Sequence, residues 1–244
     1  MPRVFSLVIF RFMISTIFLL IVSACAQPVI VSEVQPDGSL DILGPGPRFA
    51  EIFGSGLWIS SGDVIPGSLV LTEKSGKRAL LIPPGEQELT ILRPMDVVLL
   101  STSYLGWSWL MEHRDGNFHD VSILVGFRSP PEAPEQASFY SLPDAAEATQ
   151  ANRAVGIRWA ASALRRGDLA PAGADDGGVP FYVVRGGREN TGRWWSESVD
   201  LSALYARLWP DEDLARARIV FVAINAGPDR MNSPAYIADM RLFR

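Results

Sequence analysis

The only two histidines of the chain lie six residues apart, at the two ends of the stretch His113-Arg-Asp-Gly-Asn-Phe-His119. Within it, Asp115-Gly116 is a strong signal for a tight hairpin turn. With a two-residue loop His113 pairs with Phe118 and the histidines point to opposite faces, whereas with three residues they face each other. A metal site needs the second arrangement and further ligands, because structural zinc takes four. We therefore predict no metal and no cofactor.

Five acidic residues are the candidates for hydrolytic chemistry on a glycan: Glu112, Asp115, Asp120, Asp229 and Asp239. Glycoside hydrolases act through two carboxyl groups ~5 to 9.5 Å apart; these acids could in principle converge to that distance, but nothing in their sequence spacing shows that they do. The chain also has no nucleophile motif, no Gly-rich phosphate loop and no Cys/His cluster. These observations favour a protein that is not an enzyme, with a glycan-processing hydrolase as the alternative.

Tryptophan side chains are the stronger candidates for ligand contact. Trp107 and Trp109 are two residues apart in a strand-like segment and so share a face, whereas the adjacent Trp194 and Trp195 must point to opposite faces. An outward aromatic ring on a sheet is a platform for a sugar ring or a partner protein. The alternative is that all four rings belong to the core. We predict that one of Trp194 and Trp195 is a core residue and the other is partly exposed.

The single cysteine, Cys25, directly follows an apolar run over residues 12–24 that is preceded by Arg11. This pattern is typical of a signal peptide, and thirteen residues are too few for a helix to span a bilayer, which takes about 20. Val22-Ser23-Ala24-Cys25 resembles the lipobox of bacterial lipoproteins, in which the cysteine receives a diacylglycerol and becomes the new N-terminus. We expect residues 1–24 to be a lipoprotein-type signal peptide and Cys25 to be the lipidation site.

Two other readings of this N-terminus stay open. Ala24-Cys25-Ala26 also fits ordinary cleavage after Ala26. An uncleaved anchor helix over residues 4–24 would place Arg11 in the apolar zone. On the lipoprotein reading, Ala26 suggests sorting to the outer membrane, so the domain would face the periplasm as a lipid-anchored protein of the cell envelope.

The remaining chain divides into a tether and a folded domain. Residues 25–56 are rich in Pro and Gly without a periodic pattern, so we predict a tether and lead-in there and the domain over residues 57–244. The charge count is 22 Lys+Arg against 27 Asp+Glu, or −5, which argues against a nucleic-acid partner.

The domain reads as a succession of short strands bounded by Gly, Pro, Asp or Asn, a pattern typical of an all-β sandwich. The last, Tyr236–Phe243, alternates so that Ile237, Asp239, Arg241 and Phe243 should share one face. One helix interrupts the strands over residues 201–208, with Asp200 as its cap and Pro210 after its end. The strand-like segments are SLVLTE, RALLIP, ELTILR, DVVLLSTS, GWSWLMEH, DVSILVGF, AVGIRWAA, PFYVVRGG, RWWSESVD, ARIVFVAIN and YIADMRLF.

The order of several stretches resembles a bacterial family known only as domain-of-unknown-function family 3047: LGWSWLMEH, GNFHDVSILVGF, VGIRWAAS, FYVVRGGRENTGRWWSESVDLSALYARLWP and IVFVAINAGPDRMNSPAYIADMRLF. The resemblance runs from about Leu57 to the C-terminus. It implies an antiparallel jelly-roll β-sandwich in an envelope or exported protein, without an established activity. The family usually has consecutive acids before Phe118 and an Asp-x-Asp-Asn run near Asp229. This chain departs from both patterns, which argues against an acid-dependent site such as calcium.

These observations together predict an envelope lipoprotein with a non-catalytic β-sandwich domain and one short covering helix. A polysaccharide or peptidoglycan-type glycan is the first ligand class, with Trp107, Trp109, Trp194 and Trp195 as candidate contacts. The alternatives are the glycan-processing hydrolase and a scaffold that binds another envelope protein through its tryptophan-bearing edge.

Overall fold

The computed structural model describes residues 35–43, 57–61, 69–85, 88–114, 117–130, 149–171, 178–228 and 233–244. The predicted signal peptide and Cys25 lie outside the described residues, as do Asp115 and Asp229. Within the described parts of the chain, no helix is long and apolar enough to cross a bilayer.

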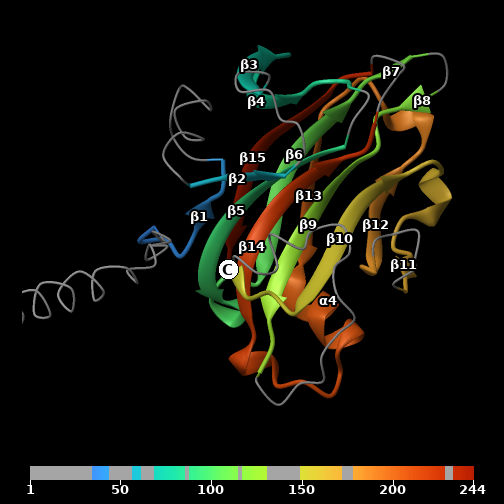
Figure 1. Cartoon of the computed structure of the whole chain (residues 1–244). Coiled ribbons are helices and arrows are strands. Elements are labelled where there is room, and N and C mark those ends of the chain that lie inside the picture. The colour runs from blue at the N-terminus through green and yellow to red at the C-terminus, as the bar shows by residue number, and fades with distance from the viewer. Residues whose placement is uncertain are drawn as a thin grey trace, which may run out of the picture. The chain divides into compact units, whose positions relative to one another are not determined.

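The described strands form two packed sheets, so the predicted β-sandwich of jelly-roll type is confirmed (Figure 1). A six-stranded sheet has the order β13 (Trp195–Asp200), β6 (Tyr104–Met111), β15 (Ala235–Phe243), β4 (Lys77–Ile82) and β3 (Val70–Lys74), with β1 (Leu40–Asp41) also on β15. A seven-stranded sheet has the order β11 (Leu169–Ala170), β12 (Phe181–Gly186), β10 (Arg153–Ala160), β9 (Val121–Arg128), β14 (Arg218–Ala226), β5 (Leu89–Val98) and β2 (Ile59–Ser61). A two-stranded ribbon joins β7 (His113–Arg114) and β8 (Asn117–Phe118).

One pair of strands departs from the predicted antiparallel arrangement. β10 and β12 run parallel, with Gly156 opposite Phe181. A parallel pair needs a connection of a dozen or more residues, and the segment 161–180, which holds the 3₁₀ helix η3 (Ala163–Arg165) and β11, supplies it. Among the described strands β10 and β12 are thus the one parallel pair of an otherwise antiparallel sandwich.

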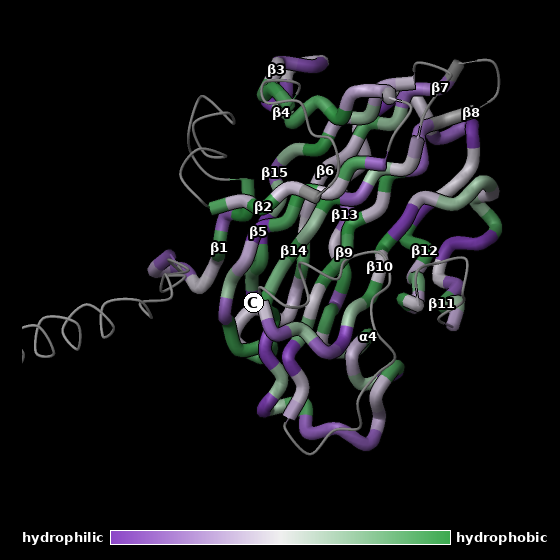
Figure 2. The backbone as a smooth tube through the Cα atoms, in the orientation of Figure 1, coloured by the Kyte–Doolittle hydropathy of each residue, from purple (hydrophilic) through white to green (hydrophobic). Residues whose placement is uncertain are grey.

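The core forms where the two sheets face each other. On β9, Ile123, Val125 and Phe127 point inward, while Leu124 points outward into a second apolar cluster that includes Phe221. Strands buried on both faces read as nearly continuous apolar runs, and Figure 2 shows hydrophobic residues recurring along β5, β9 and β14.

β5 joins two segments that the sequence predicts as separate strands, ELTILR and DVVLLSTS. Pro94 lies inside it, opposite Phe221, where the pairing of β14 shifts register. Proline cannot donate to a ladder but is tolerated at such an irregularity, so the strand continues through it.

The predicted covering helix is α4 (Leu201–Leu208), and its leucines pack as expected. Asp200 caps it by accepting a hydrogen bond from Ala203 N at 2.9 Å, and Leu201, Leu204 and Tyr205 are buried. The Tyr205 ring meets Phe127 of β9 edge to face, with 5.2 Å between ring centroids. Short 3₁₀ turns complete the irregular segments: η2 (Leu99–Ser101), η4 (Arg188–Asn190) and η5 (Leu214–Arg216).

The folded domain begins earlier than residue 57, inside the segment predicted as a tether. Leu40 pairs with Leu242 of β15, and Leu40 and Ile42 are buried in the core. Arg93 of β5 donates to the carbonyl oxygens of Asp41 and Ile42. Two pairing residues are too short a run to show an alternating pattern, which is why the sequence did not reveal this strand.

Candidate functional site

A groove of about 540 Å³ lies on the outer face of the six-stranded sheet, the face turned away from the seven-stranded sheet. Its volume falls in the range of ligand sites. Four strands supply its lining: Gln35, Asp37, Ser39 and Asp41 in and before β1, Gly106, Trp107 and Ser108 of β6, Ser196, Glu197 and Ser198 of β13, and Asp239, Met240, Arg241 and Phe243 of β15. The rings of Trp107 and the side chain of Met240 belong to the core, so alternation places Gly106 and Ser108 on the outer face.

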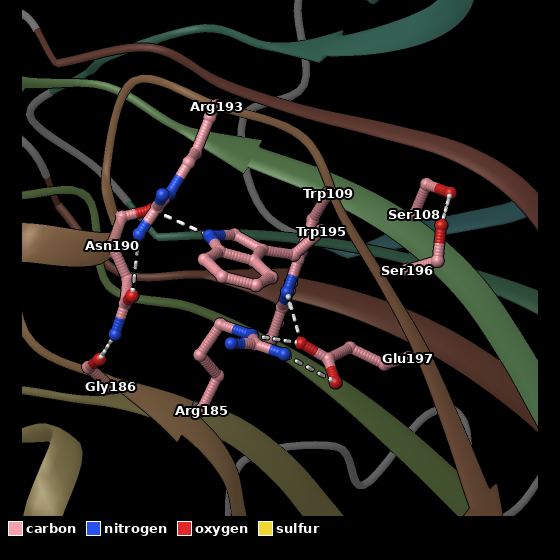
Figure 3. Close-up of polar contacts among 9 residues, drawn as sticks. All are labelled: Ser108, Trp109, Arg185, Gly186, Asn190, Arg193, Trp195, Ser196 and Glu197. Carbon is pink, nitrogen blue, oxygen red and sulfur yellow. Dashed lines mark hydrogen bonds and ion pairs between the residues drawn. The ribbon is translucent and has the colours of Figure 1, made fainter.

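Small side chains hollow the floor of the groove. Ser196 is paired with Ser108, and Ser198 with Gly106, across the β13–β6 ladder. The Ser108 and Ser196 hydroxyl oxygens are 3.0 Å apart and form a hydrogen bond (Figure 3). The floor therefore presents the hydroxyl groups of the exposed Ser196 and Ser198 rather than apolar bulk.

An aromatic pair borders the groove on one side. The rings of Tyr104 and Phe243 are stacked, with centroids 5.6 Å apart and planes inclined by 24°. Tyr104 is 37% exposed, and the Arg241 guanidinium lies 5.2 Å from the centroid of the Phe243 ring. A stacked aromatic surface beside polar groups is the combination that binds the apolar face and the hydroxyl edge of a sugar ring.

A cluster of polar groups borders the opposite side. The Lys77 ammonium donates to Asp239 Oδ2 at 2.5 Å and to Ser108 Oγ at 3.4 Å. Ser108 Oγ also donates to the same carboxylate oxygen, at 3.1 Å. A serine beside a lysine is the composition of one class of nucleophilic dyad. Here the ammonium is engaged by a carboxylate and Ser108 is 2% exposed, so this cluster orders hydroxyl groups instead of activating one.

The N-terminal segment supplies the end of the groove beyond β15. A turn at Gly38 is closed by two backbone hydrogen bonds, from Gln35 N to Ser39 O at 2.6 Å and from Gly38 N to Gln35 O at 2.9 Å. Asp37 accepts hydrogen bonds from Ser39 N at 2.9 Å and Ser39 Oγ at 2.7 Å. The side-chain hydrogen bond from Ser39, followed by the backbone one, holds the pKa of Asp37 below its ordinary value. Asp37 therefore presents a carboxylate to the groove.

Trp107 and Trp109 share one face, as predicted, but that face is the core. Trp107 is 2% exposed and Trp109 0%, and their rings meet edge to face with 5.4 Å between centroids. Burial leaves neither ring an exposed face on which a ligand could rest, and only Trp107 borders the groove, so their role as ligand contacts stays a prediction. β6 lies inside the sheet, and the small residues Gly106 and Ser108 occupy its outer face, so the large rings fill the space between the sheets.

Trp195 also points toward the core side of β13, where a polar network holds it (Figure 3). Its Nε1 donates to Asn190 O at 2.7 Å, and the Arg185 guanidinium lies 3.7 Å from its ring centroid. Arg185 forms a buried ion pair with Glu197, whose Oε1 also accepts from Trp109 Nε1 at 3.3 Å. The ring is half-buried by these contacts and is not part of the groove lining.

Trp194 lies on the other side of the chain, next to the β3–β4 hairpin. Its Nε1 donates to Lys74 O at 3.0 Å, and the Lys77 ammonium is 5.9 Å from its ring centroid. Because the same ammonium reaches Ser108 and Asp239 of the groove, this half-buried ring flanks the polar border of the groove without lining it.

The histidines adopt the two-residue-loop arrangement, with His113 opposite Phe118. His113 Nδ1 lies 2.6 Å from Thr191 Oγ1, whereas the buried His119 bonds through Nε2 to Gly227 O at 2.8 Å. Among the described residues no group of three or more His, Cys, Asp or Glu side chains could hold a metal.

The candidate hydrolytic acids that the structure describes have separate partners. Glu112 pairs with Lys74, and Asp239 with Lys77, while the backbone oxygen of Asp120 accepts from Gly227 N at 2.8 Å. The structure thus brings Asp239 alone of this set into the groove lining.

A bulge in β15 separates Ile237 from Asp239, Arg241 and Phe243, which the sequence places on the same face. Asp239 has φ 55°, and the pairing with β6 shifts between Ala238 and Arg241. Ile237 is therefore a core residue although Arg241 and Phe243 line the groove, and the predicted strict alternation is wrong. A bulge breaks the period of two, and the only local signal for it is the Asp inside an apolar strand.

No known family model matches the chain, and no curated protein sequence matches it. Several solved structures resemble this chain at low similarity. A thermostable cellulase derived from Cel12A of Rhodothermus marinus is 11% identical, with TM-score 0.41 over 78% of this chain and 93% of that one. Endoglucanase 3 of Trichoderma harzianum, from family GH12, is 8% identical, with TM-score 0.39 over 90% and 99%. A family 11 carbohydrate-binding module of Clostridium thermocellum is 6% identical, with TM-score 0.37 over 88% and 95%.

Proposed function

We propose that this protein is a non-catalytic glycan-binding protein whose site is the groove on the six-stranded sheet. The observation that carries the proposal is the stacked Tyr104–Phe243 pair beside a floor of serine hydroxyls and a carboxylate. A sugar ring has an apolar face and an edge of hydroxyl groups, so it needs both surfaces side by side. Tyr104 and Phe243 replace the tryptophans as the aromatic contacts, and Trp194 flanks the opposite side.

The same groove is less suited to hydrolysis. Glycoside hydrolases need a protonated carboxylic acid as well as a carboxylate. Hydrogen bonds from Ser39 keep Asp37 ionised by lowering its pKa, and Asp239 is engaged by the Lys77 ammonium. Both carboxyl groups line the groove, where their oxygens can accept hydrogen bonds from the hydroxyl groups of a sugar.

We also propose that the domain is held at a membrane of the cell envelope by a lipid on Cys25, facing the periplasm. The support is the position of Cys25 after a short apolar run and a lipobox-like sequence. Two or three acyl chains, at about 0.8 kcal/mol per buried CH₂, hold a soluble domain at a membrane. Cys25→Ser should abolish labelling by a radiolabelled fatty acid and release the domain from membranes. Retention of the variant in the membrane fraction at high salt, with the N-terminal segment still attached, would favour an anchor helix.

Affinity electrophoresis through gels that contain single polysaccharides tests the binding function. The panel holds β-glucan, galactan, mannan, chitin-type polymer and peptidoglycan glycan strands. We expect at least one polymer to retard the full chain, and Phe243→Ala to abolish the retardation. Phe181→Ala is the matched control, because that half-buried ring also lies over a glycine, Gly156, and beside an arginine, but belongs to the seven-stranded sheet. A folded protein that no polymer retards would contradict the proposal.

A further inference from the structure

The groove floor is open over β13 and covered over the neighbouring β6. Ser196 and Ser198 of β13 line the groove and are exposed. The Phe243 ring lies over Gly106, the residue of β6 that is opposite Ser198. Ser108, which is opposite Ser196, is 2% exposed. A ligand that lay across the strands would meet the Phe243 ring, so the accessible path runs along β13.

Trp194 lies at the other end of this path. Because Trp195 points toward the core, Trp194 directly before it points to the outer face of the sheet. Its ring is only half-buried. The Lys77 ammonium connects this ring to the groove, since it lies 5.9 Å from the ring centroid and donates to Ser108 Oγ at 3.4 Å.

Two aromatic rings therefore lie at the two ends of the serine path. Phe243 is at the level of Ser198, and Trp194 is four residues before Ser198. At ~3.3 Å per residue of extended chain, the two levels are about 13 Å apart along β13. Two neighbouring sugar rings do not span this distance. Contact with both aromatic rings needs a longer chain, whose intermediate sugars lie over Ser196.

We propose that the groove binds a glycan chain lengthwise along β13, with one sugar residue on Phe243 and a later one on Trp194. This inference rests on the glycan-binding function proposed above and adds a second aromatic contact to it. The hydroxyl groups of Ser196 and Ser198 exchange hydrogen bonds with the sugars between the two rings. The ligand is therefore an internal stretch of chain, and affinity depends on its length.

Oligosaccharides of increasing length test this arrangement. Each polymer of the gel panel is cut into a series from disaccharide to hexasaccharide, and each is titrated calorimetrically into the full chain. We expect the affinity of the wild type to rise about tenfold or more from disaccharide to hexasaccharide. Trp194→Ala should lose this rise and bind the disaccharide like the wild type, whereas Phe243→Ala should weaken binding at every length.

A second variant blocks the path between the rings without changing either ring. Ser196→Ile places a stiff, branched side chain on the open floor, and β-branched residues suit strands. It should weaken hexasaccharide binding about as much as Trp194→Ala and should melt like the wild type. Ser60→Ile is the matched control, because Ser60 is also an exposed serine on the last strand of a sheet, β2 of the seven-stranded one. Its hexasaccharide affinity should be unchanged.

The outcomes separate this inference from the function on which it rests. A disaccharide that binds the wild type as tightly as the hexasaccharide would overturn the inference. So would undiminished hexasaccharide binding to either folded variant, Trp194→Ala or Ser196→Ile. In both cases glycan binding would stand as long as Phe243→Ala still weakens it. If no oligosaccharide and no polymer bound the wild type, the proposed function itself would fail.

Discussion

The ring of Phe243 lies over Gly106, so close that a Cβ on Gly106 would be 2.9 Å from Phe243 Cε1. The glycine is thus what allows the aromatic ring to lie flat beside the groove floor. Gly106→Ala should push the ring aside, which a surface side chain at the end of β15 can accommodate without unfolding. We expect glycan affinity to fall about as much as in Phe243→Ala, by about tenfold or more.

The melting temperature distinguishes this effect from general damage. Because alanine is at least as suited to a strand as glycine, Gly106→Ala should melt within a few degrees of the wild type. If Gly106→Ala unfolded the domain, this would contradict the expectation that the Phe243 ring moves and the sheet stays in place.

The tryptophans should separate by stability. Trp109 is fully buried and donates to Glu197, so Trp109→Ala should cost about 3 to 5 kcal/mol of unfolding free energy. Trp195→Ala should also destabilise the domain, since its ring packs on the core and on Arg185. Trp194→Ala should cost clearly less. Urea unfolding of the three variants checks this order, and equal losses for Trp194 and Trp195 would contradict it.

The buried ion pair between Arg185 and Glu197 should matter far more than the surface pair between Lys74 and Glu112. Side-chain exposure is 10% and 3% in the first pair, but 32% and 31% in the second. Glu197→Gln leaves a buried guanidinium uncompensated, which costs about 3 to 5 kcal/mol. Glu112→Gln should cost about 1 kcal/mol or less. If thermal unfolding showed similar losses of stability in Glu197→Gln and Glu112→Gln, Arg185 would have another partner in the variant.

The cap of α4 should give a pH-dependent contribution to stability. Burial alone would raise the pKa of Asp200, but hydrogen bonds from Ser202 and from Ala203 N outweigh it, so the pKa lies below its ordinary 3.8. The contribution is therefore present above the unfolded-state pKa and is lost as the pH falls through the folded-state pKa. Asp200→Asn keeps a capping group but should lose this part of the acid dependence, and Asp200→Ala should cost about 1 kcal/mol at neutral pH. An acid-unfolding curve of Asp200→Asn identical to that of the wild type would contradict this.

Much of the fold can be predicted from short stretches of the sequence, because caps and alternating patterns involve residues close together in the chain. The cap at Asp200 and the spacing of Leu201 and Leu204 predict α4, and the face shared by Trp107 and Trp109 follows from alternation alone. The parallel β10–β12 pair and the two-residue strand β1 depend on long-range pairing that leaves no periodic signal.

The candidate site is less readable, since it is made by register between distant strands. Ser108 and Ser196 are opposite each other although 88 residues separate them in sequence, and neither has an unusual neighbour that would mark it. The bulge at Asp239 then places Ile237 in the core although Arg241 and Phe243 line the groove. The large rings of Trp107 and Trp109 are conspicuous in the sequence, but they fill the core. The small residues Gly106, Ser108, Ser196 and Ser198 are the ones that line the groove.

The most direct test of the central claim is a calorimetric titration of the polysaccharide that the gel panel identifies into the wild type, Phe243→Ala and Phe181→Ala. We predict saturable binding to the wild type and to Phe181→Ala with the same affinity, and a loss of about tenfold or more for Phe243→Ala, which is 1.4 kcal/mol. All three proteins should be folded by near-ultraviolet circular dichroism. Undiminished binding to a folded Phe243→Ala variant would show that the groove on the six-stranded sheet is not the glycan site.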